Sequence, residues 1–226
     1  MSDFSGRVVV VTGAAGVLGR AVADEFARRG ATLALIDILK IDGEQSSYVC
    51  DLSDHAAVQR TVARIRADHG KIDALVNIAG GFTMGEMVHE TKDATWQFMF
   101  ELNAKSVLNM ARAAVPAMIA AKSGRIVNVG ARAGLRGGAR MAAYSASKST
   151  VIRLTESLAE ELKGHGINVN CVLPSIIDTA RNRADMPGAD FAKWVQPADL
   201  ARVIAFLASD DARAIHGAAI PVEALA

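Results

Sequence analysis

The sequence lacks the residues and the charge balance on which several protein classes depend. Only two of its 226 residues are cysteines, Cys50 and Cys171, and both lie in apolar runs, so we expect buried thiols rather than a disulfide. The five histidines show no metal-ligand spacing, and no metal site is predicted. The formal net charge is +1, whereas nucleic acid and anionic membranes attract basic proteins. We therefore expect neither nucleic acid nor a membrane as a partner.

The chain also lacks long hydrophobic runs and has few aromatic residues. The apolar segment Val8–Val11 is far too short for a membrane span or a signal peptide, so we expect a cytoplasmic protein. Aromatic residues make up 5% of the chain although 51% of it is hydrophobic. A core of alanine, valine, isoleucine and leucine suits a parallel sheet with helices on both faces.

Short β-branched runs alternate with segments of helical period from one end of the chain to the other. Such alternation predicts βαβ units, and hence one α/β domain over residues 1–226 with a doubly wound, Rossmann-type parallel sheet of seven strands. The predicted strands are Val8–Val11, Thr32–Ile36, Ser47–Cys50, Ala74–Ile78, Arg125–Val129, Ile167–Leu173 and Ala218–Val222. The later predicted helices cover 102–119, 144–162 and 200–207, and residues 175–196 lack periodicity and are predicted to form a lid loop.

A glycine-rich turn follows the first predicted strand and opens the first predicted helix. Its cofactor-binding candidates are Gly13, Gly16, Val17, Leu18 and Gly19. Glycines let the backbone approach a pyrophosphate, and the free N–H groups of a helix N-terminus attract an anion. In this strand–turn–helix context the turn predicts a dinucleotide site rather than a tight turn without a ligand.

Asp37 ends the second predicted strand, 18 residues after Gly19. A carboxylate at this place accepts hydrogen bonds from the hydroxyls of the adenosine ribose. It would also repel a 2′-phosphate, and the nearest basic residue is Lys40. The predicted cofactor is therefore NAD(H) rather than NADP(H).

Tyr144 and Lys148 stand four residues apart in a predicted helix, so they share one helical face. With the glycine turn and Asp37, this pair makes the chain resemble the short-chain dehydrogenase/reductase family over nearly its whole length. Further matches are Asp51-Leu52, Asn77-Ile78-Ala79-Gly80, Asn103 and the segment Pro174–Thr179.

The resemblance implies a role for each matched residue. Tyr144 would exchange a proton with the substrate, and Lys148 would hold the nicotinamide ribose and lower the tyrosine's pKa from its usual value of about 10. Asn103 would position a water that relays the proton. The remaining members of the implied cofactor site are Asp51 and Leu52 at the adenine, Asn77, Ala79 and Gly80 along the groove, and Pro174, Ile177 and Thr179 near the carboxamide.

The chain departs from the family pattern where the chemistry is most sensitive. Ala131 stands thirteen residues before Tyr144, at the position of the family's usual catalytic serine. Gly16 also lies one place earlier than in the commonest glycine pattern, Ile78 replaces an asparagine, and the usual Asp-Gly-Gly near the end is missing. Because the serine hydroxyl polarises a substrate carbonyl in this family, its loss bears on the choice of substrate.

Without that serine, the chain resembles the dihydropteridine reductase branch of the family, which reduces a quinonoid pterin with NADH. The likeness is carried by Gly16–Gly19, Ala79–Phe82, Gly130–Ala133 and the segment from Leu173 to Trp194. One alternative substrate is a carbonyl compound such as a 3-oxoacyl thioester. An alternative of another class is a non-catalytic NAD-binding protein.

Several apolar residues in the predicted loops are candidates for contact with a small-molecule substrate. They are Phe82, Ala131, Met186 and Trp194, although Phe82 and Trp194 could instead cover the core. Arg132, Arg136 and Arg140 recur every four residues before Tyr144, which favours a solvated charged face over contacts with an acidic substrate.

The predicted helices at 102–119 and 144–162 are rich in alanine and other small residues. In the family that the chain resembles, these two helices pair across a two-fold axis. The resemblance therefore implies a homodimer or homotetramer assembled through them.

Overall fold

Seven strands form one fully parallel sheet in the order β3-β2-β1-β4-β5-β6-β7, in a computed structural model that describes residues 3–41 and 46–225. The strands are β1 (Val8–Thr12), β2 (Thr32–Asp37), β3 (Ser47–Val49), β4 (Ala74–Asn77), β5 (Gly124–Val129), β6 (Ile167–Pro174) and β7 (Ala219–Val222). The predicted sheet is confirmed, and each strand boundary lies within one residue of its expected place.

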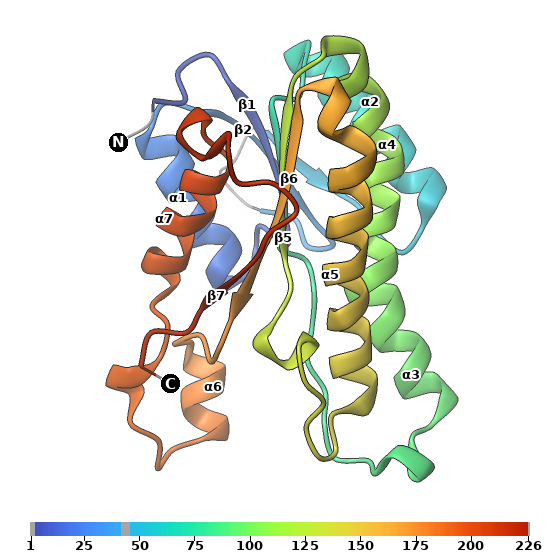
Figure 1. Ribbon diagram of the computed structural model, residues 1–226, viewed down its shortest axis with the longest axis vertical. Helices are drawn as coiled ribbons and strands as arrows, with labels where there is room; N and C mark the ends of the chain where they lie inside the picture. The colour runs from blue at the N-terminus through green and yellow to red at the C-terminus, as the bar shows by residue number, and fades with distance from the viewer. Residues whose placement is uncertain (1–2, 42–45, 226) are drawn as a thin grey trace.

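Helices cover both faces of this sheet (Figure 1). One face is covered by α1 (Val17–Arg28) and α7 (Pro197–Leu207), and the other by α2 (His55–His69), α4 (Ser106–Ala121) and α5 (Ala142–Leu162). Two further helices, α3 (Asp93–Phe100) and α6 (Ala180–Asp185), lie toward the carboxyl ends of the strands, at the bottom of Figure 1. This is the layered arrangement that the alternation of strands and helices predicts.

The central strands β1, β4, β5 and β6 are buried on both faces, and alternate residues enter different cores. In β1, Val9 and Val11 pack with α1 and α7, whereas Val10 packs with α2 and α4. Side chains of a strand point to opposite faces with a period of two, so a continuous valine run supplies both cores. Leu18, Val22 and Phe26 recur every four residues and form the buried face of α1. Both cysteines are buried and unpaired, as expected.

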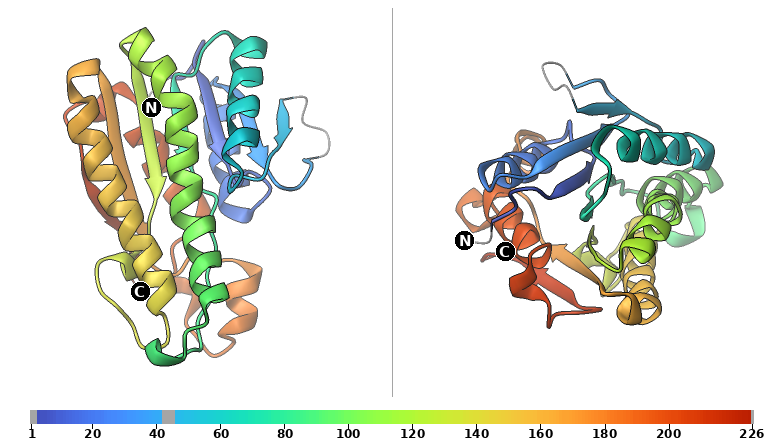
Figure 2. Two further views of the ribbon diagram at one scale, coloured as in Figure 1. Left: turned by 90° about the vertical axis from the view of Figure 1, so that its right-hand side faces the viewer. Right: turned by 90° about the horizontal axis from the view of Figure 1, so that it is seen from above.

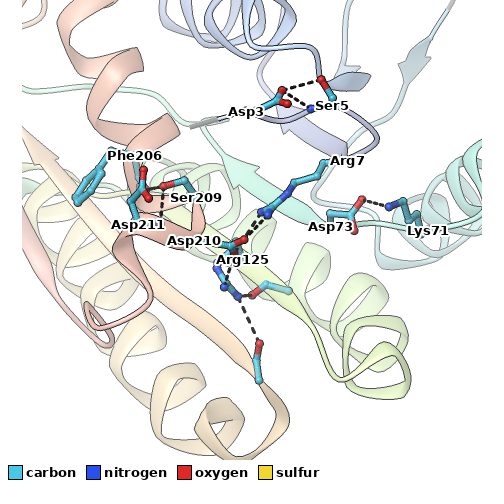
Figure 3. A network of polar contacts seen from close by, with 12 residues as sticks. Asp3, Ser5, Arg7, Lys71, Asp73, Arg125, Phe206, Ser209, Asp210 and Asp211 are labelled. Carbon is cyan, nitrogen blue, oxygen red and sulfur yellow. Dashed lines mark hydrogen bonds and ion pairs between the residues drawn. The ribbon is translucent and has the colours of Figure 1, made fainter. Parts of the chain in front are cut away.

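An ion-pair network lies at the amino ends of β1 and β5 (Figure 3). Asp210, just after α7, pairs with Arg7 before β1 and accepts a hydrogen bond from Arg125 of β5 at 2.9 Å. These contacts lower the pKa of Asp210, with the Arg7 hydrogen bond as the largest cause. The Asp210 side chain is 60% exposed, so these ion pairs are expected to add little stability.

Two segments differ from their predicted form. The helix expected at 102–119 begins at Asp93 and continues through a π-helical turn, Glu101–Lys105, into α4. The segment 175–196 is not a structureless loop, because it contains α6 and a short 3-10 turn at Phe191–Lys193. Among the described residues, no helix is both long and apolar enough to cross a membrane.

Candidate active site

The sheet changes its winding direction between β1 and β4, which are neighbours although two strands separate them in sequence. Ligands of doubly wound sheets bind beyond the carboxyl ends of the strands at such a switch point. Thr12, the last residue of β1, joins the two strand ends. Its Oγ1 accepts hydrogen bonds from the backbone N–H groups of Ile78 at 3.0 Å and Ala79 at 3.2 Å.

A cleft of about 1830 Å³ opens at this switch point. A typical small-ligand pocket has roughly 300–1,000 Å³, so this cleft has room for a dinucleotide and a second molecule. The predicted cofactor residues that line it are Gly13, Gly16, Val17, Leu18, Gly19, Asp37, Asp51, Leu52, Ala79, Gly80, Tyr144, Lys148, Pro174, Ile177 and Thr179. The strands and loops thus bring together residues that are far apart in the sequence.

The glycine turn is shaped for close backbone approach. Gly13 has φ +66°, and a Cβ there would lie 2.8 Å from the backbone nitrogen of Ala79. A Cβ at Gly19 would lie 2.1 Å from the carbonyl oxygen of Gly13. Gly16 is less constrained, because a Cβ there would lie 3.3 Å from the carbonyl oxygen of Gly13. Gly16 is also the N-cap of α1, where no side chain bonds to the first N–H groups. The first N–H groups of α1 therefore remain for an anion, which fits a dinucleotide pyrophosphate.

Asp37 is held at the cleft by the backbone. Its Oδ2 accepts from the N–H of Ala15 in the glycine turn at 2.9 Å, and its Oδ1 accepts from the N–H of Leu39 at 3.0 Å. A carboxylate has about four acceptor sites, so two remain for ribose hydroxyls. The arrangement fits the ribose of a dinucleotide.

The π-helical turn places Asn103 against the loop after β4. Its Oδ1 accepts from the N–H of Gly81 at 2.9 Å, and its Nδ2 donates to the carbonyl of Gly81 at 3.1 Å. Nδ2 also donates to Ser147 Oγ at 3.0 Å, which links the loop to α5. A Cβ on Gly80 would lie 2.7 Å from Asn103 Oδ1 and 3.1 Å from Lys148 Nζ. The amide therefore fixes the loop, and only glycine fits at position 80.

Lys148 is buried beside the end of β5. Its Nζ donates to the carbonyl oxygen of Val129 at 2.9 Å, and burial lowers its pKa to about 8. Burial also raises the pKa of Tyr144 to about 12. The tyrosine pKa in the free protein is thus raised, where the family resemblance implied a lowered value. The phenol stays protonated at neutral pH, ready to donate a proton.

Three of the four predicted substrate residues line the cleft: Phe82, Ala131 and Met186. The Phe82 ring meets the Tyr144 ring edge-on, with centroids 4.8 Å apart. Trp194 does not line the cleft, and its prediction as a substrate residue is wrong. It is 4% exposed and packs against Phe191, with ring centroids 4.8 Å apart, so it covers the core.

Asn77 does not line the cleft either, contrary to its predicted role. It is buried in the sheet, where its Nδ2 donates to Asn128 Oδ1 at 2.8 Å. Asn103 does not line the cleft, and it contacts the loop of Gly80 and Gly81 that does. Ser147 was not among the predicted site residues, yet it accepts from Asn103 and donates to the carbonyl of Tyr144 at 2.8 Å. A buried serine inside a helix gives no signal in the sequence.

These features together define a dinucleotide-binding oxidoreductase. The chain belongs to the short-chain dehydrogenase family, whose profile matches residues 7–189. It is 34% identical over 97% of both chains to the 3-oxoacyl-(acyl-carrier-protein) reductase FabG of Escherichia coli (strain K12). It is also 34% identical to the meso-2,3-butanediol dehydrogenase of Serratia marcescens, over 97% of this chain and 94% of that protein.

Solved structures of the family have the same fold. The structure of an NAD⁺-bound xylitol dehydrogenase matches with a TM-score of 0.90 and 30% identity, over 98% of this chain and 99% of that one. The protein is thus an oxidoreductase of a family that binds NAD(P). These relatives do not support the expected likeness to dihydropteridine reductases, and they favour the carbonyl-reductase alternative. No cluster of three or more metal-binding side chains occurs among residues 3–41 and 46–225.

Proposed function

We propose that the protein reduces a carbonyl compound with NADH, and that a 3-oxoacyl thioester is the first substrate to test. One observation carries the proposal: Tyr144 and Lys148 line the same cleft as the glycine turn and Asp37. This places a proton donor in one cleft with the groups suited to a dinucleotide. The relatedness to a 3-oxoacyl reductase over 97% of both chains supports the choice of substrate.

Different residues of the cleft have different roles in the proposed reaction. The reduced cofactor, when bound, supplies the hydride that adds to the carbonyl carbon. Tyr144 donates its phenolic proton to the carbonyl oxygen, which completes the alcohol. The tyrosinate left behind would be costly because burial raises the pKa of Tyr144 to about 12. Lys148 lies one turn away on the same helix face, and its ammonium group offsets that charge.

We propose NAD(H) rather than NADP(H) as the cofactor. Asp37 presents a carboxylate where the adenosine ribose is expected, and a 2′-phosphate there would meet a like charge. The solved xylitol dehydrogenase, which is 30% identical, holds NAD⁺. Lys40, three residues after Asp37, is the nearest basic residue in the sequence.

Ala131 supports a second candidate substrate, a quinonoid dihydropterin. Ala131 lines the cleft where a hydroxyl would otherwise stabilise the negative charge that develops on a carbonyl oxygen. Loss of such a donor typically costs about 10²–10³ in rate. Ser175, another hydroxyl of the cleft lining, already donates its hydrogen to the Glu223 carbonyl. A conjugated pterin spreads the incoming charge and needs a local donor less.

A panel assay separates these candidates. Oxidation of NADH and of NADPH is followed with an acetoacetyl thioester, a quinonoid dihydropterin and a simple ketone. We expect NADH-dependent reduction of the thioester, and a loss of about 10²–10⁴ in turnover in Tyr144→Phe, the usual value of a positioned acid. Ala131→Ser should raise ketone reduction more than pterin reduction. Turnover of pterin with none of thioester would replace the first candidate by the second.

Absence of any turnover, with NADH still bound, would instead favour the non-catalytic alternative.

We also propose that the protein is a homodimer or a homotetramer. α4 and α5 lie side by side on the outer surface (Figure 2), and Ala146, Ser149 and Thr150 are half-buried small residues on α5. A flat helical face of small residues suits close packing against the same face of a second copy across a two-fold axis.

A further inference from the structure

The mouth of the cleft beyond Tyr144 carries one charged side chain that the rest of the described structure leaves unpaired. Arg136 lies in the loop between β5 and α5, lines the cleft and is exposed. Among residues 3–41 and 46–225 it has no ion-pair or hydrogen-bond partner. The other charges in this part of the cleft are paired: Arg132 with Glu223 at 3.7 Å, Arg181 with Asp185 at 3.8 Å, and Glu101 with Lys105 at 3.7 Å.

Apolar side chains surround the same mouth. Phe82, Met84, Phe98 and Leu135 all line the cleft, and each is 51–57% exposed. Large apolar side chains that gather at a cleft rather than scatter over the surface mark a binding site. They offer an apolar wall to the part of a ligand that extends away from Tyr144.

The loop that carries Arg136 is anchored on both sides. On one side the N–H of Gly134 donates to the carbonyl of Ala131 at 2.9 Å. On the other side Arg140 Nη1 donates to the carbonyl of Gly85 at 2.8 Å, and the N–H of Gly85 donates to the carbonyl of Arg140 at 2.9 Å. Figure 1 shows this loop and the segment after β4 running side by side below α5. These hydrogen bonds at the two ends of the loop keep Arg136 on the same side of the cleft as Phe82 and Met84.

From this placement we infer that Arg136 binds an anionic group, a carboxylate or a phosphate, on a substrate whose apolar part lies against Phe82, Met84 and Phe98. A guanidinium group matches the paired oxygens of either anion. The inference rests on the proposed function for the position of the substrate, and it narrows that substrate to an apolar molecule with an oxyanion. It replaces the interpretation of Arg136 as part of a solvated charged face.

Binding of simple probes to the NADH-loaded enzyme tests the inference without any turnover. The probes are octanoate, octyl phosphate and octanol, which share an apolar chain and differ in charge, measured by titration calorimetry. We expect one or both anions to bind about tenfold or more tightly than octanol, since charge-assisted hydrogen bonds contribute at that scale. Preference for one anion identifies the carboxylate or the phosphate as the recognised group.

Variants assign the effect to Arg136. Arg136→Ala should remove the preference for the anions and leave octanol binding unchanged, and Arg136→Lys should retain part of it. Arg66→Ala is the matched control, because Arg66 is an exposed arginine of α2 outside the cleft. Equal binding of octanol and both anions by the unaltered enzyme, or an undiminished preference in Arg136→Ala, would overturn the inference. Failure of the proposed function would appear separately, as absence of carbonyl reduction in the panel assay.

Discussion

Lys148 places a positive charge where solvent does not reach it, and this has a cost in stability. Burial lowers its pKa from 10.5 to about 8. Below pH 8 the lysine is protonated in both the folded and the unfolded chain, so the full cost is present, about 3 kcal/mol. Between about pH 8 and 10.5 the unfolded chain holds the extra proton, so the free energy of unfolding rises with pH.

We therefore expect Lys148→Met to stabilise the cofactor-free protein while removing activity. At pH 7 the gain should be about 1–3 kcal/mol, since loss of the hydrogen bond to Val129 offsets part of it. The gain should shrink as the pH approaches 10.5. Urea unfolding at several pH values measures this, with Lys163→Met as control, since Lys163 is an exposed lysine just after α5. A destabilised Lys148→Met protein at pH 7 would contradict the argument.

Asp37 has two tasks that substitutions can separate. It faces the cleft and also accepts from the N–H groups of Ala15 and Leu39. Asp37→Asn removes the charge but keeps one side-chain oxygen as an acceptor. Asp37→Ala removes the charge and every side-chain acceptor. We expect both variants to reduce the preference for NADH over NADPH about tenfold. Only Asp37→Ala should also weaken the binding of both cofactors, because the glycine turn loses its contact with the carboxylate. The kcat/KM values with NADH and NADPH test this, and equal use of NADPH by the unaltered enzyme would refute the cofactor proposal.

The site residues that sequence reasoning located share one property. Gly13, Asp37 and Gly80 lie at or just after the carboxyl ends of strands, and these ends meet at one edge of the sheet. Trp194 and Asn77 were misplaced because their surroundings depend on tertiary packing. Asn77, for example, is bound by Asn128, which is 51 residues away. Nothing in a local pattern specifies such a partner.

At the scale of the element, the helix around Asn103 shows what periodicity cannot resolve. A π-helical turn needs one extra residue in a helix and leaves the hydrophobic pattern of its neighbours almost unchanged. The sequence therefore predicts a helix over 102–119 but not the turn at Glu101–Lys105, nor the start of the helix at Asp93. Similarly, α6 has six residues, too few to show a period.

The loop after β4 is packed so tightly on the catalytic helix that a methyl group should disturb it. A Cβ at position 80 would lie 2.7 Å from Asn103 Oδ1 and 3.1 Å from Lys148 Nζ. We expect Gly80→Ala to reduce turnover about 10²-fold, the usual effect of a misplacement of about 1 Å. Steady-state kinetics measures this loss.

Gly137→Ala is the matched control for this element. Gly137 also lines the cleft, but a Cβ there has no neighbour within 4 Å. Its turnover should stay near that of the unaltered enzyme. Equal turnover in Gly80→Ala and Gly137→Ala would show that the loop adapts and does not hold Asn103 and Lys148 in place.

At the scale of the whole molecule, the sheet was predictable because burial on both faces gives the central strands β1, β4, β5 and β6 the same apolar pattern. The helices between the strands then require parallel crossovers. The assembly of copies is not encoded in this way, because a half-buried face of small residues looks the same whether it meets solvent or a second molecule. The oligomeric state depends on contacts between chains, and the fold of a single chain does not determine them.

The proposed assembly through α4 and α5 predicts the effect of a charge on that face. Thr150 is half-buried on α5, and its hydroxyl donates only within the helix, to the carbonyl of Ala146 at 3.0 Å. In an interface with two-fold symmetry, a substituted residue occurs once in each copy, so Thr150→Glu places two carboxylates in the same interface. Burying unpaired charges there is costly, and we expect the variant to remain folded and to become monomeric.

Sedimentation velocity at micromolar concentration measures the change, and circular dichroism checks that the variant is folded. Glu161→Gln is the control, since Glu161 is an exposed residue at the far end of the same helix. Its sedimentation should match that of the unaltered protein. A Thr150→Glu protein that sediments as a dimer or a tetramer would place the interface elsewhere. A monomeric unaltered protein would rule out the assembly altogether.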